Sequence, residues 1–124
     1  MGQRFAGSLV LICVMMLGVF AVAGQNQFGV ANSYQVSFPE KVWVAGTMLP
    51  EGNYEIRHVM DGYKHVMVFR QLGVSKPAGL RAPCTIIPLP EKAADNQKNY
   101  DINVANERVL RELIFKGDSA KHVF

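Results

Sequence analysis

The stretch NYEIRHVMDGYKHVMVF, residues 53–69, decides the fold. On both sides of the pair Asp61-Gly62, polar and apolar side chains alternate with a period of two, which is typical of β-strands with one buried face. Asp-Gly between two such segments is a strong signal for a two-residue hairpin loop with a type I′ turn. The stretch therefore predicts an antiparallel hairpin at the centre of the domain.

A loop made of Asp61 and Gly62 would also fix the register of this hairpin, because the loop length sets which residues face each other. Eight side chains would then share the face toward the core, in the opposed pairs Met60–Tyr63, His58–His65, Ile56–Met67 and Tyr54–Phe69. The other face carries charged stems beside valines, so we expect it to be half exposed.

The rest of the chain consists of short β-favouring segments separated by turn residues. Residues 80–89 are apolar, but Pro83 and Pro88 interrupt them, which favours an edge strand or a bulged strand because proline donates no ladder hydrogen bond. Residues 106–115, NERVLRELIF, fit a helix or a strand, and the β-favouring residues among them favour a strand. We therefore expect an all-β domain at 33–124, a sandwich or small barrel of six to eight short antiparallel strands.

The first residues have the features of a secretory signal peptide. Arg4 precedes a long apolar run from about residue 9 to residue 22, and Ala21-Val22-Ala23 matches the small-residue pattern of a cleavage site. We predict a signal peptide at 1–23 and a flexible lead-in at 24–32, with the mature chain secreted or periplasmic. The alternative is an uncleaved membrane anchor.

Loss of the signal peptide changes the cysteine and charge counts. It removes Cys13, so Cys84 is the single thiol of the mature chain, either buried as a small hydrophobic residue or joined to another chain by a disulfide. It also removes Arg4, which leaves 12 basic and 10 acidic residues. Such a small excess, with no run of basic residues, does not favour nucleic-acid binding.

His58 and His65 are the most specific candidates for chemistry. Opposed side chains on antiparallel strands have Cβ atoms about 4.5–5.5 Å apart, and imidazole is a good ligand for zinc and copper. The sequence thus raises the hypothesis of a metal site at His58 and His65, with His122, Asp61 or Cys84 as a third ligand. The alternatives are a ring pair that only packs, or a pH-sensitive pair in which two protonated imidazoles repel.

Catalysis has little support in the sequence. No serine lies in a G-x-S-x-G context, and a Cys84–histidine dyad would lack an obvious feature that lowers the thiol pKa. We therefore assign no catalytic residue and no cofactor. The aromatic residues could line a pocket for a small apolar ligand, but in a small domain they more often form the core.

The phrases LPEGNYEIRHVMDGYKHVMVF, APCTIIPL and NERVLRELIFKGDSAKHVF resemble an uncharacterised family of small exported bacterial proteins that share an LPxGxY phrase. The resemblance implies export and a compact β domain, and it implies no activity and no catalytic residue. We expect a non-enzymatic exported domain, a binding or structural module of the cell envelope, whose partner is an unknown protein or a small apolar ligand. The alternative is a zinc- or copper-binding protein that uses the histidine pair.

Overall fold

The computed structural model describes residues 26–124, and the predicted signal peptide lies outside them. In this range the chain forms nine β-strands and no helix, so the all-β prediction is confirmed. Accordingly, residues 26–124 include no helix with the length and apolar character needed to cross a membrane.

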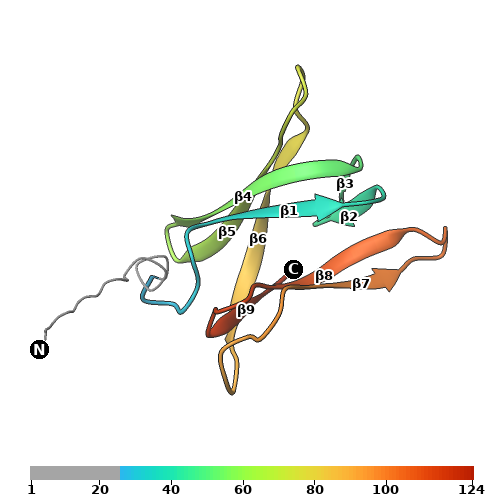
Figure 1. Cartoon of the computed structure of the whole chain (residues 1–124). Helices are drawn as coiled ribbons and strands as arrows, with labels where there is room; N and C mark the ends of the chain where they lie inside the picture. Colours follow the sequence, from blue (N-terminus) through green and yellow to red (C-terminus); the bar gives the residue numbers. More distant parts are fainter. Residues whose placement is uncertain (1–25) are drawn as a thin grey trace, which may run out of the picture.

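The strands form two layers joined by one long strand (Figure 1). The first layer is antiparallel and contains β1 (Ser33–Phe38), β4 (Gly52–Asp61) and β5 (Lys64–Gln71). The second layer contains β9 (Ala120–Val123), β8 (Arg108–Ile114), β7 (Gln97–Ile102), β2 (Val42–Val44) and β3 (Thr47–Leu49). The joining strand is β6 (Gly79–Pro88), which runs through both layers.

β6 covers most of the segment predicted as an edge strand or a bulged strand. Its residues 79–84 pair with β5, and its residues 85–88 pair with β9, so the strand lies inside the strand order. Each half nevertheless has only one strand neighbour. Pro83 lies opposite Val66 of β5, in a half whose other side has no ladder, and a missing N–H is tolerated at such a position.

The central hairpin forms where the sequence predicts it, but its register differs. Asp61 pairs with Lys64, so the loop consists of Gly62 and Tyr63 instead of Asp61 and Gly62. Gly62 has φ 63° and Tyr63 has no positive φ, which is the φ pattern of a type II′ turn and not of type I′. The predicted pair His58–His65 is therefore wrong as a directly opposed pair: His58 faces Met67, and His65 faces Met60.

The second layer confirms one sequence prediction and differs from another. Residues 108–114 form a strand, which confirms the strand assignment for the ambiguous segment. β8 pairs with β2 in parallel, whereas we expected antiparallel strands throughout. The turn between β2 and β3 has positive φ at both Ala45 and Gly46, as a type I′ turn requires. The type I′ turn predicted for the central hairpin thus occurs in the β2–β3 hairpin instead.

The core lies between the two layers and takes up most of the aromatic side chains. Phe38, Tyr54, Phe69 and Phe115 are buried in it, which agrees with the core interpretation of these residues. Tyr63 is the most exposed of the described aromatic residues, because it lies in the hairpin loop.

The lead-in is packed against the domain from Asn26 onward. The Asn26 backbone N–H donates to the carbonyl of Val30, and Val30 is completely buried. The Ser119 N–H donates to the carbonyl of Gly29, which joins this segment to the C-terminal part of the chain. Residues predicted as a flexible lead-in thus cover one end of the interior.

Candidate functional site

All three histidines of the chain meet at this covered end of the interior. β4 supplies His58, β5 supplies His65 and β9 supplies His122. Because β-strand side chains alternate between faces, His58 and His65 share the inner face of the hairpin, as predicted, although they are diagonal neighbours.

His58 and His65 form a close pair. The Nε2 atom of His58 lies 2.9 Å from the Nδ1 atom of His65, and their rings stack with centroids 5.1 Å apart and an angle of 24°. At this distance the two rings form a hydrogen bond, in which one nitrogen carries the proton and donates and the other nitrogen accepts the bond. Two imidazole nitrogens are therefore directed at a common point between β4 and β5.

The lead-in surrounds this pair on its outer side. The Phe28 ring meets the His65 ring edge-on at a centroid distance of 4.6 Å, and it lies 6.0 Å from the His58 ring. The Asn26 side-chain amide lies 3.4 Å from His58 Nδ1 and donates a hydrogen bond to the Asn32 side chain. Nothing in the polar, glycine-containing lead-in predicted these contacts.

A second polar arrangement lies deeper and includes His122. We call Cys84, His122, Tyr34 and Asp118 the inner polar chain. The Nδ1 atom of His122 lies 4.0 Å from the Cys84 Sγ, and its Nε2 atom lies 3.4 Å from the Tyr34 hydroxyl. That hydroxyl donates a short hydrogen bond to the Asp118 carboxylate and accepts one from the Ala31 N–H. Both ring nitrogens of His122 therefore face groups other than His58 and His65.

Burial favours the neutral form of His122 and of His58. The pKa of the completely buried His122 is lowered to about 4, mainly by burial and secondarily by electrostatic interaction with His58 and His65. Burial also lowers the pKa of His58, with His65 as the second cause. Neutral imidazole is the form that binds metals, because a ring nitrogen must be unprotonated to act as a ligand.

The three residues considered as a third ligand have different positions. The ring centroid of His122 lies 6.1 Å from that of His58. Cys84 lies directly opposite His65 in the β5–β6 register. Asp61 follows Met60 at the end of β4 and so lies on the opposite face of the hairpin. As they stand, no three histidine, cysteine or acidic side chains of residues 26–124 form a metal-binding group.

The contact between Cys84 and His122 also bears on catalysis. A catalytic thiol–imidazole pair requires a thiolate, which positive or dipolar surroundings stabilise. Here burial raises the pKa of the Cys84 thiol to about 11 while it lowers that of His122. Both groups are favoured in their neutral forms, so the half-buried Cys84 is not a thiolate in the metal-free protein.

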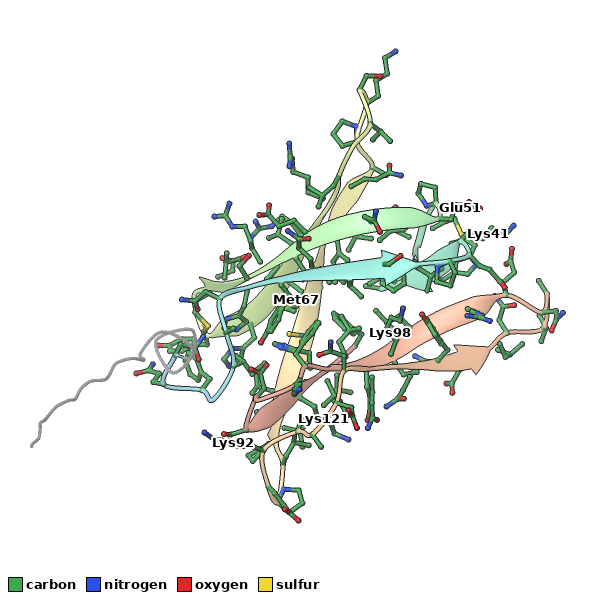
Figure 2. The ribbon with its side chains drawn as sticks, in the orientation of Figure 1. Lys41, Glu51, Met67, Lys92, Lys98 and Lys121 are labelled. Carbon is green, nitrogen blue, oxygen red and sulfur yellow. The ribbon has the colours of Figure 1, made fainter. Side chains whose placement is uncertain are left out.

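Two hollows of the described surface lie away from the histidines. One of about 540 Å³ is lined by Glu40, Lys41, Met48, Pro50 and Glu51, and Figure 2 shows Lys41 and Glu51 at the end of the molecule where β2 and β3 lie. A smaller one of about 160 Å³ separates β1 from β7, where Lys98 reaches across to donate to the Ser37 carbonyl. Charged and apolar side chains line both hollows, with Met48 and Pro50 in the larger one and Ile114 and Phe115 in the smaller one.

Comparisons with protein-family models, with curated proteins and with solved structures gave no match for this chain. The fold and the arrangement of the histidines are therefore the basis for a functional proposal.

Proposed function

We propose that this protein is an exported, non-enzymatic β domain of the cell envelope that acts by binding, and that its ligand is a zinc or copper ion held by His58 and His65. One observation carries the proposal: His58 Nε2 and His65 Nδ1 face each other at 2.9 Å. Two imidazoles on adjacent strands of a rigid hairpin provide a preformed part of a metal site.

The distance between these nitrogens is close to the one that a shared metal ion requires. When two nitrogens bind the same zinc ion at about 2.0–2.1 Å in tetrahedral geometry, they lie roughly 3.3 Å apart. The pair would need to open by only a few tenths of an ångström. Because burial lowers the pKa of His58, this imidazole needs no deprotonation near neutral pH.

Within residues 26–124, the protonation state of Cys84 supports binding over catalysis. Cys84 and His122 are both neutral, so no activated thiolate is available beside the pair. Support for export comes from the apolar run and the Ala21-Val22-Ala23 pattern of the sequence. Mass spectrometry of the exported protein tests export directly, since retention of Met1 would contradict cleavage.

Calorimetric titration of the mature protein with Zn²⁺ and Cu²⁺ tests the metal proposal. The wild type should bind one ion per chain, and the His58→Ala/His65→Ala variant should lose this binding. Tyr63→Ala is a matched control, because Tyr63 lies in the same hairpin but is fully exposed in its loop. Equal and weak uptake by the wild type and the double histidine variant would refute the proposal.

A further inference from the structure

Three potential metal ligands lie in one row across the first layer. In the observed register Met60 of β4 lies opposite His65 of β5, and His65 lies opposite Cys84 of β6. Directly opposed residues share a face and have Cβ atoms about 4.5–5.5 Å apart. His58 joins this row diagonally through its 2.9 Å contact with His65.

The donor atoms of this row are nitrogen and sulfur only: two imidazoles, one thiol and one thioether. Asp61, the nearest carboxylate along β4, lies on the other face of the hairpin. Thiolate and thioether ligands select soft ions such as Cu(I), whereas zinc sites use cysteine, histidine and carboxylate ligands and not methionine. Met60 is therefore the residue whose presence distinguishes the two ions.

We infer that the ion bound at the histidine pair is Cu(I), and that Cys84 and Met60 complete its coordination with His58 and His65. This inference rests on the proposed function and assigns the metal and two further ligands. It also assigns the third ligand to Cys84 in place of His122, whose two nitrogens face Tyr34 and Cys84.

Cys84 must reorient to form this site, because its Sγ faces His122. Its Sγ lies 4.0 Å from His122 Nδ1, which is a weak contact, so rotation about the Cα–Cβ bond toward His65 gives up little. On binding, the Cys84 S–H bond breaks, the sulfur electron pair forms the bond to Cu(I), and the proton passes to solvent. No electron is transferred, because the ion binds and remains as Cu(I).

The row is accessible from the Met60 end. Met60 is 44% exposed although it lies on the same face as buried His58, because the hairpin extends past the core at this point. An ion can reach the Met60 thioether first, while the Phe28 ring covers the histidine rings from the lead-in. A role as a metal ligand would explain why Met60, an apolar side chain, is exposed at this position.

Competition of the mature protein with bicinchoninate for Cu(I), under anaerobic reducing conditions, tests the inference. We expect Met60→Leu and Cys84→Ser each to weaken Cu(I) binding by about tenfold or more, a loss in the range seen when groups that support a metal site are removed. Met60→Leu should leave Zn²⁺ binding unchanged. Met48→Leu, in β3 and outside the row, is the matched control. Thermal melting of each variant checks that it is folded.

The outcomes separate the inference from the proposed function. If Met60→Leu and Cys84→Ser bind Cu(I) as tightly as the wild type, while His58→Ala/His65→Ala loses metal binding, the inference is wrong and the histidine site remains. If the double histidine variant binds every ion as the wild type does, both proposals fail. Loss of Cu(I) binding in the folded Met60→Leu variant, with Zn²⁺ binding retained, supports both.

Discussion

The His58–His65 pair and the inner polar chain lie next to each other and contain the same kind of side chain, yet their surroundings differ. His122 is completely buried, and its nitrogens face Tyr34 and Cys84, which belong to the domain interior. His65 is partly exposed, and the nitrogens of the pair face each other beneath the lead-in. A polar group whose partners are all internal stabilises the fold, whereas two imidazole nitrogens that face each other in a partly exposed place are suited to a ligand.

The largest expected effect is acid destabilisation through His122 in the metal-free protein. The pKa of His122 is about 4 in the folded state and about 6.5 in the unfolded state, so the unfolded chain binds more protons between these values. The stabilisation is complete above pH 6.5 and is lost as the pH falls toward 4, by about 3 kcal/mol. Urea unfolding between pH 7 and pH 4 measures this loss.

His122→Gln should flatten this pH profile, whereas His65→Gln should retain it. Asp118 has the opposite effect on stability in acid. Burial raises its pKa, so the folded state binds this proton more readily than the unfolded state and gains stability as the pH falls. An identical acid loss in the wild type and in folded His122→Gln would contradict the assignment to His122.

The next effect is the loss of the Tyr34 hydroxyl. Tyr34→Phe removes the donor to the buried Asp118 carboxylate and the acceptor of the Ala31 N–H. Leaving buried polar groups unpaired costs about 2 kcal/mol, which lowers the melting temperature of a domain of this size by roughly 10 °C. Tyr63→Phe is the matched control, because Tyr63 is fully exposed and should melt as the wild type does. Similar melting temperatures of the two variants would contradict a stabilising role of the Tyr34 hydroxyl in the inner polar chain.

A smaller effect is expected at the turn that positions the histidine pair. Gly62 has φ 63°, and an alanine in this left-handed region is strained by about 1 kcal/mol. Gly62→Ala should lower the free energy of unfolding by this amount and leave the acid profile unchanged, since His122 lies on β9. Unfolding in urea at pH 7 measures the change, and an unchanged midpoint would contradict the turn conformation.

The smallest effect on stability is expected for His65→Gln. His65 is partly exposed, and glutamine retains a polar side chain near His58, so the free energy of unfolding should change by less than about 1 kcal/mol. The metal-dependent stabilisation should nevertheless disappear. A ligand at 100 times its Kd stabilises a folded protein by about 2.7 kcal/mol, and thermal melts with and without Cu(I) measure this difference. Equal stabilisation of wild type and variant would exclude His65 as a ligand.

The hairpin illustrates how far local sequence patterns reach. A period of two assigns the inner face correctly, because side chains of a strand alternate whatever its partner is. The register depends on which two residues form the loop, and both Asp61-Gly62 and Gly62-Tyr63 allow the required glycine conformation. Moving the loop by one position changed His58 and His65 from opposed to diagonal neighbours, which is a distinction that alternation alone does not contain.

The candidate site was predictable in part for the same reason. His58 and His65 lie seven positions apart in one hairpin, so local rules bring them together. Tyr34 and Asp118 lie 84 positions apart, and no spacing in the sequence indicates their hydrogen bond. The predicted register placed Met60 opposite Tyr63, so only the structure shows that Met60 lies opposite His65.

The sequence by itself determined the all-β class, the central hairpin, its inner face and the strand at residues 108–114, because these depend on alternation and turn residues within a few positions. Only the tertiary structure decided the sharing of β6 between two layers, the parallel pairing of β2 with β8 and the approach of His122 to His58. These contacts join distant segments, and they form because the two layers bury a common core. That burial is a property of the whole domain, and it places three histidines, a thiol and a thioether at one end of it.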